Sequence, residues 1–337
     1  MRLSRIVLLL LCLGFAAAST GCDVAIQAID TAAKSAAENT PATASVETGE
    51  VVPVAASRPA TPTPGAPTIR VASFNIQAFG PTKLSNDWAM QHIAAIVRQF
   101  DVVAIQEIRS QDQTLMDVLT RYVNADGSQY NYLLGERLGR TSSKEQYAYI
   151  YDSRTIAAYG EAYTVRDEED WLHREPFVAR FTTTARAGTR PFSCSLANVH
   201  TDPDEVPQEL QALARVFTAA AAYESTAWGE DDFIMLGDFN ADARQLASHA
   251  PTGEFAPTIT REPTNVAGNA QYDNALLSGR SCEEFTGRCG VYDFPRQFGL
   301  SAAEAKKISD HLPIWCEFSA DEMQQPRGYP VSAPAGL

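Results

Sequence analysis

Residues 233–242 read FIMLGDFNAD, an apolar run followed by a glycine and by two polar side chains on either side of a phenylalanine. The run at 233–236 is short and continuous, which is typical of a buried β-strand. Asp238 and Asn240 then stand at the end of that strand. Gly, Asp and Asn also favour tight turns because of their own backbone preferences, so this stretch taken alone is compatible with an ordinary turn.

The same combination of an apolar strand and a polar end recurs along the chain. Five further runs predict strands, at residues 69–76, 102–106, 192–199, 274–277 and 312–318. The polar residues at their ends are, in chain order, Asn75, Glu107, His200, Asp273, Asp310 and His311. The first three lie at or just past the end of a strand, and the last three come just before one. If the last two strands run antiparallel to their neighbours, all these side chains lie on one edge.

Two longer stretches, residues 86–100 and 206–223, repeat apolar residues at helical spacing. Ser85 and Asp204 precede them and belong to the residue types that cap helix N-termini. Short strands mixed with such helices predict an α/β domain with two sheets and flanking helices.

Carboxylate, amide and imidazole groups at one edge indicate a particular kind of site. Carboxylate and amide oxygens are the ligands of hard divalent cations. Imidazole, with an ordinary pKa of about 6.5, accepts or donates a proton near neutral pH. Taken singly, each residue has a structural explanation, such as a turn Asn, an exposed Glu or a buried His. In this order and at matching strand ends, they predict a metal site served by two histidines.

The composition is that of a soluble globular protein with an acidic surface. The chain has 337 residues, of which 45% are hydrophobic and 20% charged, and its net charge is −14. These values exclude a collagen-like chain, a multi-span membrane protein and a wholly disordered chain. They also exclude nucleic-acid binding through a broad basic surface. If the protein handles phosphates, divalent cations must supply much of the positive charge.

The N-terminus predicts export. Residues 1–22 contain two arginines, an apolar run and then small residues, the layout of a secretory signal peptide. The apolar run is shorter than the roughly 20 residues of a membrane-spanning helix. Residues 19–22 (STGC) are similar to the bacterial lipoprotein signal, so Cys22 is predicted to be acylated and to anchor the protein at a membrane outside the cytoplasm. Ordinary secretion is the alternative.

The rest of the chain divides into three parts. Residues 23–67 are rich in Ala, Thr and Pro and predict a disordered tether; residues 68–319 form one domain; residues 320–337 form a disordered tail. An exported chain with an even number of cysteines favours disulfides. Cys282 and Cys289 are close in sequence and are predicted to pair, which leaves Cys194 and Cys316 either to pair or to remain buried thiols.

Six short segments, in this order, resemble the endonuclease/exonuclease/phosphatase superfamily. They are Phe74-Asn75-Ile76, Gln106-Glu107, Asn198-Val199-His200, Gly237-Asp238-Phe239-Asn240, Tyr272-Asp273 and Ser309-Asp310-His311. Within this superfamily the chain resembles deoxyribonuclease I, because segments outside the shared core also match. These are LGR at 138–140 with Lys144-Glu145, Arg174-Glu175-Pro176, GDFNAD at 237–242, YDFPRQFGLS at 292–301 and ISDH at 308–311.

The resemblance implies a four-layered α/β sandwich, with two packed mixed β-sheets flanked by helices. It also implies hydrolysis of phosphodiester bonds that requires Mg²⁺, with Ca²⁺ as a structural ion. Carried over by position, Glu107 holds the catalytic metal with Asn75 and Asp310 nearby. Asp238 and Asn240 position the phosphate, or Asp238 helps to hold a second cation.

The remaining roles follow from the same resemblance. His200 and His311 are the acid/base pair, with Glu145 orienting His200 and Asp273 orienting His311. The nucleic-acid contacts are Arg109, Arg174 and Arg140. Which histidine is the acid and which the base stays open.

Five positions depart from the family pattern. Gln77 replaces an Arg, Ser143 and Gln245 each replace a Tyr, and Ala243 and Ala270 occupy the positions of a long-range disulfide. The first three changes remove one cation and two stacking surfaces from the expected DNA face. They leave open weaker duplex binding or a preference for another nucleic acid.

The sequence therefore predicts an exported, monomeric, metal-dependent endonuclease that cleaves double-stranded DNA with little sequence preference. One alternative is a phosphodiesterase of the same superfamily that acts on phospholipid head groups or small phosphoesters. The other is a catalytically silent binding protein on the same fold.

Overall fold

The computed structural model describes residues 67–322, apart from 142–143, 186–187, 250–254 and 279–281. The predicted signal peptide, Cys22 and Ser143 lie outside the described residues, as do nearly all of the tether and most of the tail. Within the described residues, no helix has the length and apolar character needed to cross a membrane.

The first sheet has six strands in the order β11-β12-β1-β2-β4-β3. Their bounds are β1 (Thr68–Phe79), β2 (Val102–Ile108), β3 (Tyr130–Leu134), β4 (Gln146–Asp152), β11 (Phe285–Val291) and β12 (Ile314–Ser319). β1 is parallel to β2 and antiparallel to β12.

The second sheet also has six strands, in the order β5-β6-β7-β8-β10-β9. Their bounds are β5 (Ile156–Thr164), β6 (Phe177–Thr183), β7 (Ser193–His200), β8 (Phe233–Asp238), β9 (Ala256–Pro257) and β10 (Asp273–Leu277). β8 is parallel to β7 and antiparallel to β10. Together with β12, this antiparallel strand brings the polar strand ends to one edge, as the sequence predicts.

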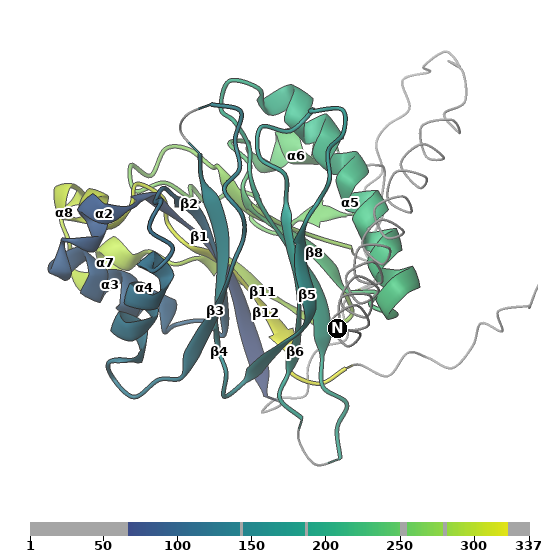
Figure 1. The fold of residues 1–337 in the computed structure, drawn as a ribbon, viewed down its shortest axis with the longest axis horizontal. Helices are drawn as coiled ribbons and strands as arrows, with labels where there is room; N and C mark the ends of the chain where they lie inside the picture. Colours follow the sequence, from purple (N-terminus) through teal and green to yellow (C-terminus); the bar gives the residue numbers. More distant parts are fainter. Residues whose placement is uncertain (1–66, 142–143, 186–187, 250–254, 279–281, 323–337) are drawn as a thin grey trace, which may run out of the picture.

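Helices cover the outer face of each sheet (Figure 1). The first sheet carries α2 (Pro81–Leu84), α3 (Asp87–Val97), α4 (Leu115–Asn124), α7 (Phe294–Phe298) and α8 (Ala302–Ile308). The second carries α5 (Val206–Trp228) and α6 (Ala243–His249). Three buried apolar clusters separate the layers: one between helices and the first sheet, one between the sheets and one under α5 and α6. The predicted four-layered α/β sandwich is confirmed.

The two predicted helices are present as α3 and α5, but both predicted caps are wrong. Asn86 caps α3 by accepting a hydrogen bond from Ala89 N at 3.2 Å, whereas Ser85 Oγ donates to Thr82 O in the preceding turn. Glu205 stands at the N-cap of α5 and makes no side-chain cap bond. Pro207 lies in the first turn of α5, where its fixed φ suits a helix start.

The structure does not join Cys282 to Cys289, and all four described cysteines are free thiols. β11 places Cys289 directly opposite Cys316 of β12. Cys282 instead lies near Asp232 and Cys194. Closeness in sequence is a poor guide here because β11 is an extended strand that carries Cys289 away from Cys282.

Candidate active site

The polar strand ends line one pocket of about 300 Å³. β2 contributes Glu107, β7 His200 and β8 Asp238, while His311 lies in the turn before β12. The other lining residues are Arg109, Thr141, Glu145, His173, Arg174, Asp202, Pro203 and Asn240. Predicted residues from strand ends in both sheets therefore share one cavity. Asn75, Asp273 and Asp310 are not among its lining residues, although each contacts a side chain that is.

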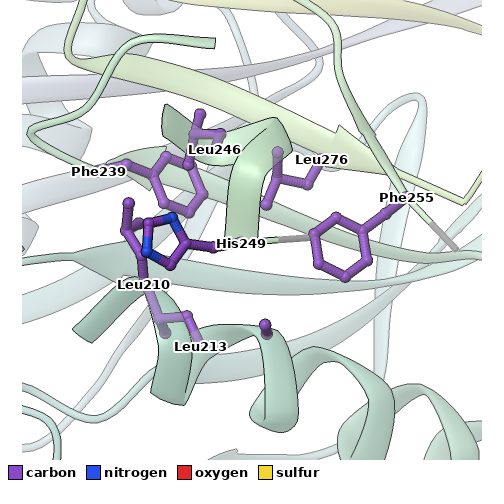
Figure 2. Close-up of a pocket in the computed structure, with 8 residues that line it drawn as sticks. Leu210, Leu213, Phe239, Leu246, His249, Phe255 and Leu276 are labelled. Atoms are coloured by element: carbon purple, nitrogen blue, oxygen red, sulfur yellow. The ribbon is translucent and has the colours of Figure 1, made fainter. Parts of the chain in front are cut away.

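In the motif at residues 237–240, the side chains of Asp238 and Phe239 lie on opposite sides of the second sheet. Asp238 faces the pocket, while Phe239 is fully buried in the apolar layer under α5 and α6. Figure 2 shows the Phe239 ring among leucines of these helices. The cavity between these side chains has a volume of only about 10 Å³, which leaves no room for a ligand. Gly237 has φ +155°, and a Cβ there would lie 2.0 Å from Val199 O on β7. Glycine is thus required for β8 to approach β7 this closely.

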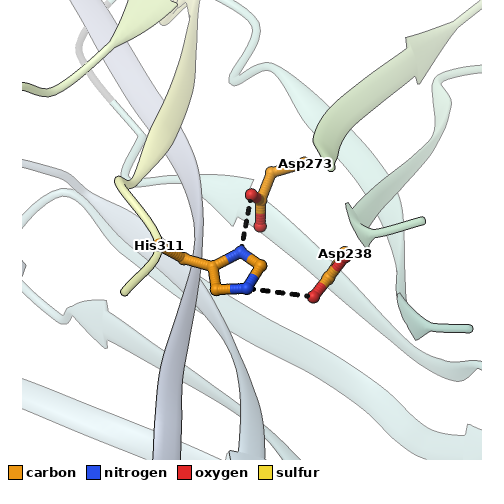
Figure 3. Close-up of side chains that lie close together, drawn as sticks. All are labelled: Asp238, Asp273 and His311. Atoms are coloured by element: carbon orange, nitrogen blue, oxygen red, sulfur yellow. Dashed lines mark hydrogen bonds and ion pairs between the residues drawn. The ribbon is translucent and has the colours of Figure 1, made fainter. Parts of the chain in front are cut away.

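Two histidine–carboxylate pairs meet at Asp238. His200 Nδ1 lies 2.8 Å from Glu145 Oε2, and His311 Nδ1 lies 2.9 Å from Asp273 Oδ2. The Nε2 atom of each histidine is 3.6 Å from the same oxygen, Asp238 Oδ2. Figure 3 shows the second pair, with the ring of His311 between the two aspartates. A carboxylate on Nδ1 orients each ring, so each Nε2 faces the pocket in position for proton transfer.

The residues predicted to hold the catalytic metal fit a hard cation. Asn75 Nδ2 donates to Glu107 Oε1 at 3.1 Å and to Asp238 Oδ2 at 2.9 Å, which leaves Asn75 Oδ1 buried without a hydrogen-bond partner among the described residues. Such an oxygen beside a carboxylate suits Mg²⁺ or Ca²⁺. Glu107 has φ +60°, a conformation that is strained for a non-glycine residue and recurs at functional sites.

Asp310, predicted to lie near the catalytic metal, does not line the pocket but has its Oδ1 4.0 Å from His311 Nε2. Gln77 Nε2 donates to Asp310 Oδ2 at 2.8 Å, so the residue that replaces a family Arg still orients the carboxylate. Lys83, which the sequence analysis missed, donates to Ile76 O and Ile308 O below it. Burial lowers the pKa of Lys83 to about 8, although the negative charges of Glu107 and Asp310 act to raise it. A lone Lys in a four-residue helix carries no sequence signal for this role.

Charges around each pair set its protonation. Burial alone would raise the pKa of Glu145, but the hydrogen bond and charge of His200, together with Arg174 and Arg109, lower it to about 2. Burial alone would lower the pKa of His311, but the charges of Asp273 and Asp238 raise it to about 10. Thr264, also missed in the sequence, donates to Asp273 Oδ2 at 2.8 Å and fixes that carboxylate.

The three predicted nucleic-acid arginines are all engaged within the protein. Arg109 bridges Glu107 and Glu145 at 3.0 and 2.8 Å, with its side chain 40% exposed. Arg174 is buried and donates to the carbonyl oxygens of His200 and Thr201. Arg140 bonds Asp170 and Glu205. Arg109 and Arg174 line the pocket, so contact with a substrate phosphate stays a prediction for them.

The low pKa of Glu145 predicts a loss of stability in acid. Because the folded pKa lies below the ordinary 4.5, the ionised carboxylate stabilises the fold above about pH 4.5, and this stabilisation is lost as the pH falls towards 2. We expect the gap in unfolding free energy between wild type and Glu145→Gln to narrow by about 2 kcal/mol between pH 5.5 and pH 3. Urea unfolding at the two pH values measures it. A gap that stays constant would contradict this pairing of charges.

Fold and site together define a phosphoester hydrolase built on a four-layered α/β sandwich. Residues 72–311 match the family model described as Endonuclease/Exonuclease/phosphatase family, and the chain belongs to that family. It is 33% identical over 271 residues to deoxyribonuclease-1-like 1 of Sus scrofa, covering 76% of this chain and 82% of that protein. It is 30% identical over 268 residues to deoxyribonuclease-1-like 2 of Mus musculus, covering 75% and 93%. The chain is thus a deoxyribonuclease I-like member of the family.

Solved structures agree on the fold. Truncated TDP2 from Caenorhabditis elegans superposes with a TM-score of 0.52 at 15% identity, covering 75% of this chain and 98% of that chain. A mannosyl-6-phosphatase from Bacteroides thetaiotaomicron superposes with a TM-score of 0.50 at 14% identity, covering 74% and 98%. At this identity the likeness concerns the fold alone. Family membership and the relatives make the protein a hydrolase of phosphodiester bonds.

Proposed function

We propose that the protein is a divalent-metal-dependent endonuclease that hydrolyses DNA with low sequence specificity. The observation that carries the proposal is the convergence of two histidine–carboxylate pairs on Asp238, with each Nε2 at 3.6 Å from the same oxygen. One proton must leave the attacking water and another must reach the leaving oxygen, and two oriented imidazoles supply both transfers. Relatives named deoxyribonuclease-1-like support DNA as the substrate.

The raised pKa of His311 supports one assignment of the acid and base roles that the sequence left open. His311 is held as an imidazolium by Asp273 and Asp238, so it donates a proton from Nε2 to the leaving oxygen. His200 then accepts the proton of the attacking water at its own Nε2, while Glu145 fixes its ring through Nδ1. Asn240, whose Nδ2 donates to Thr201 O at 2.9 Å, stands beside them and positions the phosphate.

Glu107, Asn75 and Asp310 would hold the catalytic Mg²⁺, and Asp238, which shares the amide of Asn75 with Glu107, would position the phosphate or help to hold a second cation. When bound, such an ion offsets the negative charge that develops on the phosphate oxygens. The net charge of −14 makes this contribution necessary, because the protein itself repels a polyanion. We therefore expect activity to fall with added monovalent salt as well as with chelator.

Export and a lipid anchor at Cys22 are part of the same proposal, and the domain acts as a monomer. An extracytoplasmic nuclease needs no high specificity, because it never meets the chromosome of its own cell. The engaged arginines agree with low specificity, since bidentate arginine contacts to base edges are the commonest specific readout.

The second candidate is a phosphodiesterase that acts on phospholipid head groups or small phosphoesters. Gln77 favours it, because this residue replaces a family cation and is committed to Asp310. The internal bonds of Arg140 favour it too, since they withdraw another cation from the expected DNA face.

The test is nicking of supercoiled plasmid by the purified full chain, with Mg²⁺ plus Ca²⁺ and then with chelator. Single-stranded DNA, RNA, phosphatidylinositol vesicles and a small aryl phosphodiester form the rest of the panel. We expect metal-dependent nicking that Glu107→Ala abolishes and that Glu283→Ala, a change at an exposed surface residue, leaves intact. Cleavage of only the lipid or the aryl ester would move the assignment to the second candidate. A folded protein that cleaves nothing would contradict both.

A further inference from the structure

A second cluster of carboxylates lies at the end of β8 opposite the active site. Asp232 immediately precedes β8, six positions before Asp238, which separates the two by about 20 Å along an extended strand. Glu284 immediately precedes β11, and Glu322 lies just beyond the end of β12. Asp232, Glu284 and Glu322 each place an oxygen within 4.8 Å of the other two. Three segments far apart in sequence thus bring their charges together.

This cluster is buried and incompletely satisfied. Asp232 is 2% exposed and Glu284 3% exposed. Asp232 Oδ1 is a buried oxygen without a hydrogen-bond partner among the described residues. Next to it, Glu230 is held by Tyr159 Oη at 3.1 Å and by Asp232 N at 2.9 Å. An unpartnered carboxylate oxygen among other carboxylates is unfavourable unless a cation or a proton joins it.

We propose that Asp232, Glu284 and Glu322 bind a calcium ion. The site is separate from the catalytic metal and does not depend on the proposed nuclease activity. Ca²⁺ takes six to eight oxygen ligands in flexible geometry, which carboxylates and nearby carbonyls can supply, whereas Mg²⁺ demands a stricter octahedron. Ser193 N donates to Glu322 Oε1 at 3.1 Å, which orients this carboxylate and leaves Oε2 for the ion.

Such an ion would join the ends of three strands. Glu284 O already accepts from Ser319 N at 2.7 Å, and Pro191 forms a bridge with Asp321. Calcium at the cluster would add a charged link between the start of β8, the start of β11 and the chain beyond β12. The expected consequence is a more stable fold, with no change at the pocket on the other end of β8.

The test measures the melting temperature of the full chain after chelation and after addition of Ca²⁺. We expect Ca²⁺ to raise it by about 5–10 °C at saturation. Glu284→Gln should abolish the rise, and Glu283→Gln, its exposed neighbour, should keep it. Glu107→Gln should also keep the rise while losing nicking, which separates this site from the catalytic one.

A second readout covers the case in which Glu284→Gln folds poorly. Terbium luminescence excited through tyrosine should appear in wild type, because Tyr159 lies against Glu230, and should fall at least fivefold in Glu322→Gln. An equal rise of melting temperature in wild type and Glu284→Gln would overturn the proposal. So would the absence of any rise together with greater stability at lower pH, which would mean that protons hold the cluster.

The strand register carries a second, independent inference about the cysteines. Tyr292 follows β11 and Pro313 precedes β12, and Tyr292 N donates to Pro313 O at 2.7 Å, so these two residues stand at a hydrogen-bonded position of the ladder. Pairs alternate along an antiparallel ladder, and three positions back Cys289 and Cys316 form a non-hydrogen-bonded pair. The Cα atoms of such pairs are about 4.5 Å apart, within the range of disulfides. Both thiols also point at one residue, with Cys289 Sγ 3.3 Å from Thr258 O and Cys316 Sγ 3.4 Å from Thr258 Oγ1.

We infer that Cys289 and Cys316 form a disulfide in an oxidising compartment. The two thiols lose two protons and two electrons as the sulfur–sulfur bond forms, and a disulfide oxidant such as oxidised glutathione is reduced to two thiols. Proteolytic peptide mapping after exposure to oxidised glutathione should find the peptides of Cys289 and Cys316 joined. In Cys316→Ser, Cys289 should stay open to alkylation. Joining of Cys289 to Cys282, or an alkylatable Cys289 in oxidised wild type, would overturn the inference.

Discussion

We expect the replacement of His311 by asparagine to lower the rate of DNA cleavage about 10³-fold, which lies within the range measured for general acid–base groups. His311 Nε2 points at Asp238 Oδ2 from 3.6 Å, and its imidazolium is held by Asp273 at 2.9 Å. Asparagine keeps polarity but has no proton to give at neutral pH, so the leaving oxygen departs without one. Initial rates of plasmid nicking at saturating Mg²⁺ measure the effect.

Asp273→Asn provides the second half of this experiment. If Asp273 acts through His311, the double variant should be hardly slower than His311→Asn alone, because residues that work as a unit are not additive. His92→Asn is the matched control: His92 lies on α3, where its Nδ1 is 2.8 Å from Trp88 O. The proposed roles fail if His311→Asn is folded and cleaves as fast as this control.

We expect the replacement of Arg180 by methionine to lower the free energy of unfolding by about 3–5 kcal/mol. Arg180 on β6 makes two bonds to Glu224 on α5, at 2.5 and 2.8 Å, and the two side chains are 2% and 0% exposed. The guanidinium also lies 4.0 Å from the centre of the Trp228 ring. Methionine fills similar space but leaves the charge of Glu224 buried and uncompensated. Urea unfolding at pH 7 measures the loss.

The double variant Arg180→Met/Glu224→Met separates the charge from the packing. Removing both partners of a buried ion pair costs far less than removing one, so the double variant should recover most of the stability. Tyr163 and Ser195 donate to Glu224 as well, at 2.8 Å each, and they limit this recovery. A single variant within 1 kcal/mol of wild type would show that this pair does not stabilise the fold.

The sequence predicted best where burial leaves a local pattern. The runs at 69–76 and 102–106 became β1 and β2, because both strands are mostly buried and most of their residues are apolar. Glu107, His200 and Asp238 were found for the same reason, since each lies at the end of such a run. Asn75 lies near the end of its run but within β1, which continues to Phe79. β11 was missed because most of its residues are partly exposed and its register shifts between Phe285 and Cys289. β6 was missed because Arg180 interrupts its apolar run.

By itself, the sequence determined the family, the sandwich of two sheets and the edge on which the catalytic side chains lie. Those properties depend on short apolar runs and on the residues that end them, and both are local. Only the tertiary structure decided that Arg174 faces inward, that Cys289 meets Cys316, and that Asp232, Glu284 and Glu322 crowd together. These contacts depend on strand order and register, which bring together segments up to ninety positions apart in the sequence. Neither segment carries a periodic pattern that would predict its partner.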